Sequence, residues 1–207
     1  MPRESDARAI ALYQAIMIEA RSRALSINAI TATQASVSKA IIRECCYLQL
    51  RMLCELVALG CLVAHGDITN TRYFQKQAYK ADDILNALER LHPTFFPHPM
   101  VPRFSPGHIH LDEVAADFKY IRKSELITLY GRCGSILHKG NISRLKARPP
   151  DIVDFRDVEE WGQKILNLLL AHKISRIGGR IHFITLLNDI NGNVAVAIAG
   201  LPEDGAV

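Results

Sequence analysis

The chain has 207 residues, of which 49% are hydrophobic and 22% are charged, and its formal net charge is +4. This length allows one domain with a real hydrophobic core, and the composition excludes the disordered and fibrous classes. The first residues are charged and lack the apolar run of a signal peptide, and the longest apolar stretch, residues 56–64, is too short to span a bilayer. We therefore expect a cytoplasmic protein without a membrane partner.

Three helices are predicted in the N-terminal half from apolar residues at helical spacing. They cover residues 5–25, about 36–64 and 71–91, and the second is apolar almost all round, as the central helix of a bundle is. Four of the five cysteines fall in this second helix, and we interpret them as reduced core residues. Cys54, Cys61 and His65 lie near one of its faces, but no second ligand pair completes a zinc site.

Residues 92–110 contain five prolines in nineteen positions, which predicts a long loop. A short helix is expected to follow from Leu111. The loop also carries four histidines, which leave metal binding open, although an ordinary surface loop is the simpler interpretation: His92, His98, His108 and His110.

The C-terminal half predicts two more helices and a hairpin. One helix runs from Ser124 to Lys139, and after a basic linker at 144–150 another covers 154–174. Residues 180–189 and 193–201 are predicted to pair as a β-hairpin. We therefore expect an all-α fold, with a bundle of four to five main helices in residues 1–175 and a small C-terminal β-hairpin in residues 176–207.

The candidate functional segment is YGRCGSILHKG, residues 130–140. On a helical wheel Arg132 and His138 lie at opposite edges of one polar face, about 120° and about 9 Å apart. They are too far apart to pair directly, so joint action requires a cleft or a two-fold axis between two chains. An arginine offers a planar fork for phosphate, and a histidine is the side chain that ordinarily titrates near neutrality.

Charged residues near this segment suggest a polyanionic partner. Residues 118–148 carry eight basic residues against a single acidic one, a local net charge of +7. A solvated surface is the alternative. On the second helix Glu44, Arg51 and Glu55 share one stripe, where charges are costly unless they are paired. Arg51 and Glu55 form a structural pair in one interpretation; in the other, a carboxylate of this stripe orients Arg132 or His138.

The pattern of Arg132, five intervening residues and His138 on a late helix resembles the HEPN superfamily of helical-bundle proteins. The resemblance covers about residues 36–175, and the stretch RMLCELVALG, residues 51–60, is similar to the Arg/Glu-bearing helix of bacterial relatives. One position departs from the family pattern, because Cys133 stands where a polar residue often follows the arginine.

The resemblance implies a metal-independent endoribonuclease that needs no cofactor and acts as a toxin or phage-defence effector, with a partner protein that neutralises it. It implies a homodimer in which the two 132–138 segments face each other across an RNA substrate. His138 would transfer protons and Arg132 would stabilise the phosphate while the 2′-hydroxyl attacks. Supporting roles fall to Ser135, Lys139, Glu55 and Glu44, and binding of the RNA backbone to Lys123, Arg144, Lys146 and Arg148.

Two other hypotheses remain. The first is a non-catalytic HEPN-like module that binds a nucleotide, a nucleic acid or a partner protein, which the departure at Cys133 favours. The second is an assembly protein whose C-terminal hairpin pairs between chains, because both of its strands are apolar.

Overall fold

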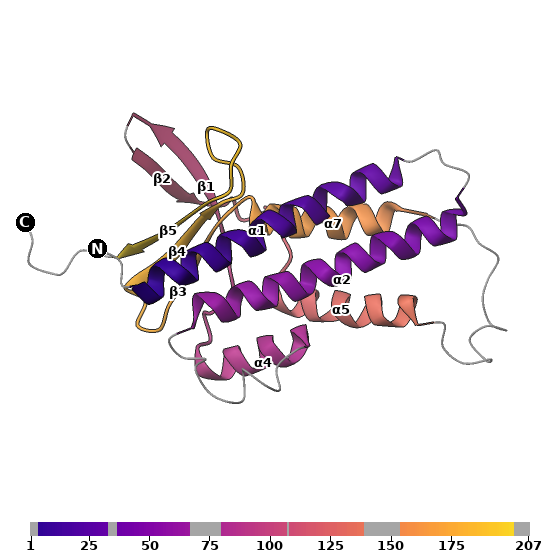
Figure 1. The fold of residues 1–207 in the computed structure, drawn as a ribbon, viewed down its shortest axis with the longest axis horizontal. Coiled ribbons are helices and arrows are strands. Elements are labelled where there is room, and N and C mark those ends of the chain that lie inside the picture. Colours follow the sequence, from indigo (N-terminus) through magenta and orange to yellow (C-terminus); the bar gives the residue numbers. More distant parts are fainter. Residues whose placement is uncertain (1–3, 33–36, 67–79, 107, 139–153, 201–207) are drawn as a thin grey trace, which may run out of the picture.

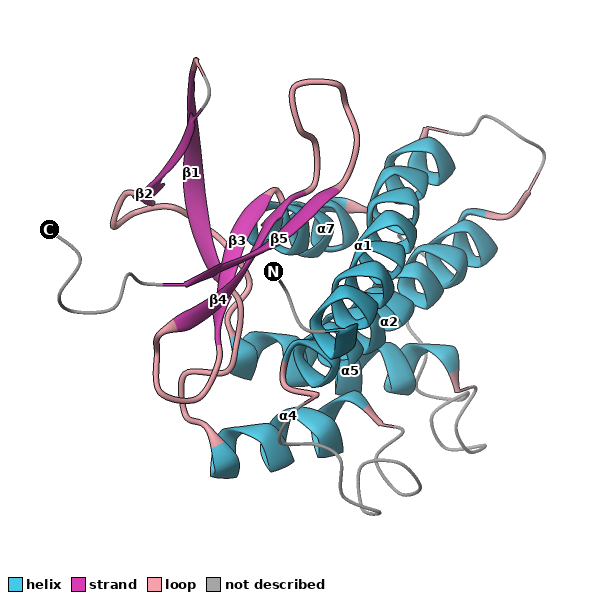
Figure 2. Ribbon diagram, turned by 60° about the vertical axis from the view of Figure 1, so that its left-hand side comes forward, coloured by secondary structure: helices cyan, strands magenta, loops and turns pink. Residues whose placement is uncertain are grey.

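The computed structural model of the chain describes residues 4–32, 37–66, 80–106, 108–138 and 154–200. Its helices in these ranges are α1 (Glu4–Thr31), α2 (Lys39–Ala64), α4 (Ala81–Leu91), α5 (Lys123–Leu137) and α7 (Arg156–Leu169). Its strands are β1 (His98–Ser105), β2 (His108–Glu113), β3 (Ala171–Ser175), β4 (Ile181–Leu186) and β5 (Ala195–Gly200). The helices pack side by side, and the strands form a sheet toward one end of them (Figure 1, Figure 2).

The second helix, α2, occupies the centre of the helical layer, as predicted. It contacts α1, α4, α5 and α7, and its Leu50 and Leu53 are fully buried. Helix α1 approaches closely at Gly60, where a Cβ atom would lie 3.2 Å from the ring of Tyr13. The cysteines of α2 are free, and three of them are buried, whereas Cys45 is exposed.

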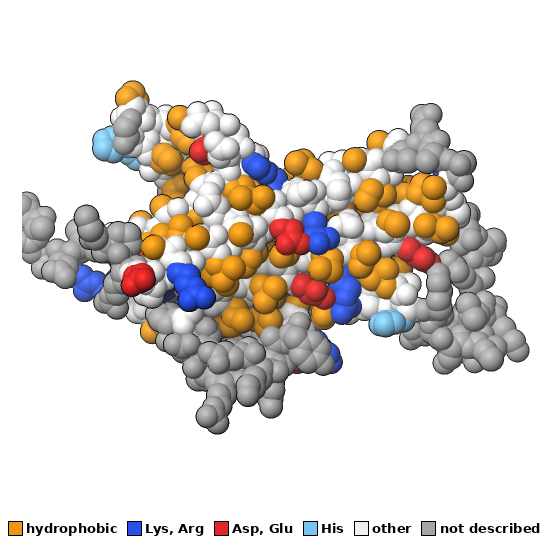
Figure 3. Space-filling view, viewed as in Figure 1, with side chains coloured by type: hydrophobic (Ala, Val, Ile, Leu, Met, Phe, Trp, Pro, Cys, Tyr) orange, Lys and Arg blue, Asp and Glu red, His pale blue; other side chains and the backbone are white. Residues whose placement is uncertain are grey.

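Helix α2 is also the one helix among the described residues that has the length and apolar composition of a membrane span. In the structure, 56% of its most apolar window is buried inside the protein. Figure 3 shows that the hydrophobic side chains on the face of α1 and α2 are interspersed with charged ones. The large exposed hydrophobic residues of the two helices are Leu12, Ile18, Leu25, Ile41, Leu48 and Leu59.

The expectation of an all-α fold is wrong, because the strands form one antiparallel sheet in the order β2-β1-β3-β4-β5. The predicted C-terminal hairpin is present as β4 and β5, but β4 also pairs with β3. The prediction had assigned residues 154–174 to one helix, whereas α7 ends at Leu169 and β3 begins two residues later. The physical reason is tertiary pairing, since Ile174 lies opposite Phe183 and both side chains are fully buried.

The predicted loop at 92–110 and the short helix from Leu111 are also wrong, because β1 and β2 form a hairpin there. Prolines fit in β1 because the two neighbouring strands cover different parts of it. Pro99 lies in the part paired with β3, and Pro102 lies in the part paired with β2. At each proline β1 therefore has a neighbouring strand on one side only and is an edge strand. Proline, which has no N–H to donate, is tolerated at such positions.

Helix α5, which carries the candidate segment, begins and ends near the predicted positions. The Glu125 carboxylate accepts a hydrogen bond of 2.9 Å from the backbone N–H of Arg122, which caps the first turn. The helix ends at Leu137, two residues before the predicted end at Lys139, and His138 has extended backbone angles. Helix α4 confirms the later part of the predicted third helix, and residues 71–79 lie outside the described ranges.

Candidate functional site

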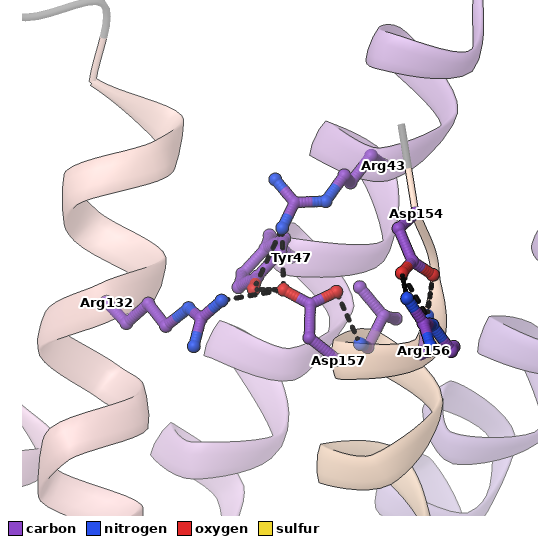
Figure 4. Close-up of polar contacts among 7 residues, drawn as sticks. Arg43, Tyr47, Arg132, Asp154, Arg156 and Asp157 are labelled. Atoms are coloured by element: carbon purple, nitrogen blue, oxygen red, sulfur yellow. Dashed lines mark hydrogen bonds and ion pairs between the residues drawn. The ribbon is translucent and has the colours of Figure 1, made fainter. Parts of the chain in front are cut away.

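Arg132 belongs to a cluster of four side chains from three helices (Figure 4). Arg132 on α5 donates a hydrogen bond of 2.7 Å to Oδ2 of Asp157, in the first turn of α7. Arg43 on α2 donates to the same oxygen at 2.6 Å, and the Tyr47 hydroxyl also donates to it. One carboxylate oxygen therefore accepts hydrogen bonds from two guanidinium groups and a phenol. The cluster contains two positive charges and a single negative one.

The electrostatics of this cluster keep Asp157 ionised and Tyr47 protonated. Burial by itself would raise the pKa of Asp157, but the hydrogen bond from Tyr47 and the charges of Arg43 and Arg132 outweigh it and lower this pKa. Burial, followed by the hydrogen bond to Asp157, raises the pKa of Tyr47. The guanidinium carbon of Arg43 lies 4.9 Å from the centre of the Tyr47 ring, within the range of a cation–π contact.

The three charged side chains of the cluster are accessible from solvent, whereas Tyr47 is buried. The side chain of Arg132 is 45% exposed, whereas those of Arg43 and Asp157 are 28% and 25% exposed. An incoming anion can therefore reach Arg132 without unfolding of the helices. A half-exposed cluster also loses less free energy by desolvation than a buried ion pair does.

His138 lies at the other end of the predicted pair. Its side chain is exposed, and its backbone N–H donates to the carbonyl of Gly134 at 3.0 Å, the last helical bond of α5. Because the chain leaves the helix at His138, the helical wheel does not fix the direction of this side chain. The structure gives no contact between Arg132 and His138 within one chain.

The residues between Arg132 and His138 point in two directions. Ser135 is exposed, and its hydroxyl donates to the carbonyl of Gly131 at 3.2 Å, so its first partner is its own helix. Cys133 is fully buried, and this burial raises the pKa of its thiol to about 12. The position after the arginine therefore faces the core between α2 and α5, where a polar side chain would need a buried partner.

The charged stripe of α2 forms a separate arrangement with α5. Arg51 pairs with Glu55 at 3.3 Å and donates to the Tyr130 hydroxyl at 2.8 Å, with its guanidinium 4.4 Å from the centre of the Tyr130 ring. The structural pairing of Arg51 with Glu55 is thus the interpretation that the contacts support. Glu44 is half-buried on the same helix.

The predicted RNA-binding residues are only partly described. Lys123 forms an ion pair with Glu89 of α4, at the opposite end of α5 from His138. Lys139 and the basic residues Arg144, Lys146 and Arg148 lie outside the described ranges. Within those ranges no group of three or more His, Cys, Asp or Glu side chains is placed to hold a metal ion.

Sequence reasoning missed Arg43, Tyr47 and Asp157 as members of the cluster. A signal was present, because Arg43 and Tyr47 are four residues apart on a mostly apolar helix and so share one face. Asp157 stood at the expected start of a helix, where a carboxylate is favoured for local reasons alone. Nothing in the spacing connects these residues with Arg132, which lies 85 residues after Tyr47 and 25 residues before Asp157.

Comparisons with known proteins give no further assignment: no family model matches the chain, and no match was found among curated proteins or solved structures.

Proposed function

We propose that this protein is a metal-independent endoribonuclease of HEPN type whose phosphate site is the cluster around Arg132. The observation that carries the proposal is the convergence of Arg43, Arg132 and Tyr47 on one oxygen of Asp157. Guanidinium groups arranged around one anionic oxygen have the geometry that recognises a phosphate oxygen. The charge excess of this cluster and the exposure of Arg132 support the same use.

The proposed reaction needs no metal or cofactor. A base removes the proton of the RNA 2′-hydroxyl, whose oxygen attacks the adjacent phosphorus, and the bond from phosphorus to the 5′-oxygen breaks. An acid gives a proton to that leaving oxygen, and the products are a 2′,3′-cyclic phosphate and a 5′-hydroxyl. His138 performs proton transfer, while Arg132 and Arg43 stabilise the charge that accumulates on the phosphate oxygens.

We further propose that two chains form the active site. Two proton transfers occur on opposite sides of the phosphorus, and a single histidine serves only one of them at a time. A homodimer in which the 132–138 segments face each other supplies two histidines and two arginines. The exposed position of His138 at the end of α5 is compatible with such a pairing. The toxin or defence role and the neutralising partner belong to the same proposal.

A second candidate is a non-catalytic module that binds nucleic acid through the same cluster. Two observations favour it. Asp157 already occupies the guanidinium group of Arg132, and position 133 faces the core instead of the site. This candidate predicts saturable RNA binding that depends on Arg132 but produces no cleavage.

The test is cleavage of a fluorescent RNA in EDTA by wild type, His138→Ala and the control His110→Ala, which changes an exposed histidine of the β1–β2 hairpin. We expect EDTA-resistant cleavage that falls at least about 100-fold in His138→Ala and is unchanged in the control. RNA binding without cleavage by wild type would support the second candidate instead. Cleavage that persists in His138→Ala would contradict the assignment of this histidine.

A further inference from the structure

A cavity of about 500 Å³ lies at the N-terminal end of α5. It is formed by β1, β2 and β3 on one side and by the segment that leads into α5 on the other. Lys173 of β3, Glu113 of β2 and His98 of β1 line the sheet side, while Tyr120 and Arg122 line the other side. The cavity shares no lining residue with the cluster around Arg132.

The described lining of this cavity has more basic than acidic side chains, although two of its three cations are paired with carboxylates. Arg122, Lys123 and Lys173 face a single carboxylate, Glu113, among the described lining residues. Glu113 accepts hydrogen bonds from both Lys173 and His98, and these bonds, the one from Lys173 first, lower its pKa. The carboxylate is thus largely neutralised, and it holds Lys173 and His98 in position on the sheet.

Within the described residues, Arg122 is the cation of the lining that forms no close ion pair, although its charge helps to lower the pKa of Glu125 in the first turn of α5. Its side chain is exposed, and in the described part of the chain it makes no ion pair, whereas Lys123 pairs with Glu89. Arg122 is the N-cap residue of α5, a helix of 15 residues whose positive dipole end favours an anion and already has the Glu125 carboxylate in its first turn.

The cavity also contains aromatic surface. Tyr120 and Phe96 are half-buried in its wall, and the Tyr120 ring stacks on Phe118 with the ring centres 6.3 Å apart. Aromatic rings with a polar group nearby are the surfaces on which planar ligands stack. The volume is in the range of small-molecule sites and far below what a folded partner needs.

We propose that this cavity is a binding site for a small phosphomonoester that carries a planar ring, such as a nucleoside monophosphate. Arg122 binds the phosphate group together with Lys173, and Tyr120 stacks on the ring. The site is separate from the RNA-cleaving centre, and its occupancy does not depend on the function proposed above.

The experiment is calorimetric titration of the full chain with AMP, adenosine and inorganic phosphate. We expect one saturable AMP site per chain, with affinity about tenfold or more above that for either fragment, because each fragment makes only part of the contacts. Arg122→Ala is expected to lower AMP affinity about tenfold, and Tyr120→Leu about threefold or more. The matched control, Arg103→Ala, removes the same charge from the β1–β2 hairpin outside the cavity and is expected to bind AMP as wild type does.

One further ligand tests whether the phosphate belongs to an RNA strand, and one further variant tests whether a loss of affinity comes from misfolding. A 5′-phosphorylated oligoribonucleotide that binds more tightly than AMP, with the same loss in Arg122→Ala, would identify the ligand as the end of an RNA strand. Arg122→Lys keeps the charge and is expected to retain more affinity than Arg122→Ala. The absence of AMP binding, or equal binding by wild type and Arg122→Ala, overturns the proposal. AMP binding by His138→Ala shows that this site is independent of the cleavage site.

Discussion

Two tyrosine-centred clusters of this protein use similar hydrogen bonds in opposite settings. In the core, the Tyr13 hydroxyl donates to Nε2 of His172 at 2.7 Å, and the ring nitrogen Nδ1 of His172 faces the carbonyl of Leu169 at 3.3 Å. The ring of Tyr47 is equally buried, but its hydroxyl donates to Asp157, beside two arginines whose side chains reach solvent. The first cluster is fully buried and neutral, whereas the second has a buried tyrosine with partly exposed charged side chains and a net positive charge.

The difference separates a stabilising cluster from a binding cluster. Burial lowers the pKa of His172 to about 4, so this side chain is neutral at physiological pH and each ring nitrogen has one partner. It gains nothing from a ligand and has no access to one. The cluster around Arg132 keeps a charge excess at the surface, which folding alone does not require. Substitutions that lower the free energy of unfolding should therefore differ from those that change RNA binding and cleavage.

The largest stability effect is expected from Tyr13→Ala. Tyr13 is 1% exposed and its ring lies 5.6 Å from that of Phe183, so the substitution leaves a cavity between α1 and the sheet. We expect the free energy of unfolding in urea to fall by about 3–5 kcal/mol. The control Phe118→Ala truncates an exposed aromatic ring and should cost less than about 1 kcal/mol. Equal losses for the two variants would contradict the assignment of Tyr13 to the core.

The pH dependence of stability should identify His172. Its folded pKa of about 4 lies below the unfolded value of about 6.5, so the unfolded chain takes up a proton first as the pH falls. The contribution of His172 is fully present above about pH 6.5 and is lost as the pH falls toward 4. We expect a loss of about 2 kcal/mol between pH 7 and pH 5. His172→Gln cannot titrate, so its unfolding free energy should lack this part of the slope; an unchanged slope would refute the assignment.

Asp157→Asn should affect stability and RNA affinity in opposite directions. The substitution removes the charge that neutralises two arginines, which costs about 1 kcal/mol because the site is partly exposed to solvent. It also frees the guanidinium group of Arg132, so RNA affinity should rise about threefold or more at low salt. Fluorescence anisotropy with labelled RNA measures the second effect. A loss of both stability and RNA affinity would indicate a purely structural cluster.

The smallest stability effect is expected from Arg43→Ala, below about 1 kcal/mol. RNA affinity should nevertheless fall about threefold or more, because the variant removes one of two cations that face the phosphate. Arg156→Ala is the matched control. Its side chain is 89% exposed and pairs with Asp154 instead of Asp157, so we expect wild-type RNA affinity. Similar losses in both variants would show that RNA senses only the overall charge.

Sequence predicted the helices of this fold better than its sheet. Helices α1, α2 and α5 follow from local periodicity, which a single segment contains. Strand β3 was assigned to a helix because its residues 171–175 continue a helical pattern, and only pairing with β4 distinguishes the two states. The β1–β2 hairpin was missed because Pro99 and Pro102 exclude a central strand unless the neighbouring strands are offset.

The candidate site shows the same limit. Arg132 was identified from local spacing, but its partners Arg43, Tyr47 and Asp157 come from distant helices and depend on tertiary packing. The burial of Cys133, in contrast, is predictable from the sequence, because this residue falls on the apolar arc of the helix.

The most direct test of the proposed ribonuclease site is the EDTA-resistant rate of RNA cleavage by Arg132→Ala, compared with the rate of Tyr13→Phe. Tyr13→Phe leaves Nε2 of His172 without its donor and should lose about 1–3 kcal/mol of stability. We predict that this variant cleaves RNA as wild type does under conditions where it is folded, whereas Arg132→Ala keeps most of its stability and loses at least about 100-fold in rate. A cleavage rate of Arg132→Ala equal to that of wild type would contradict the account.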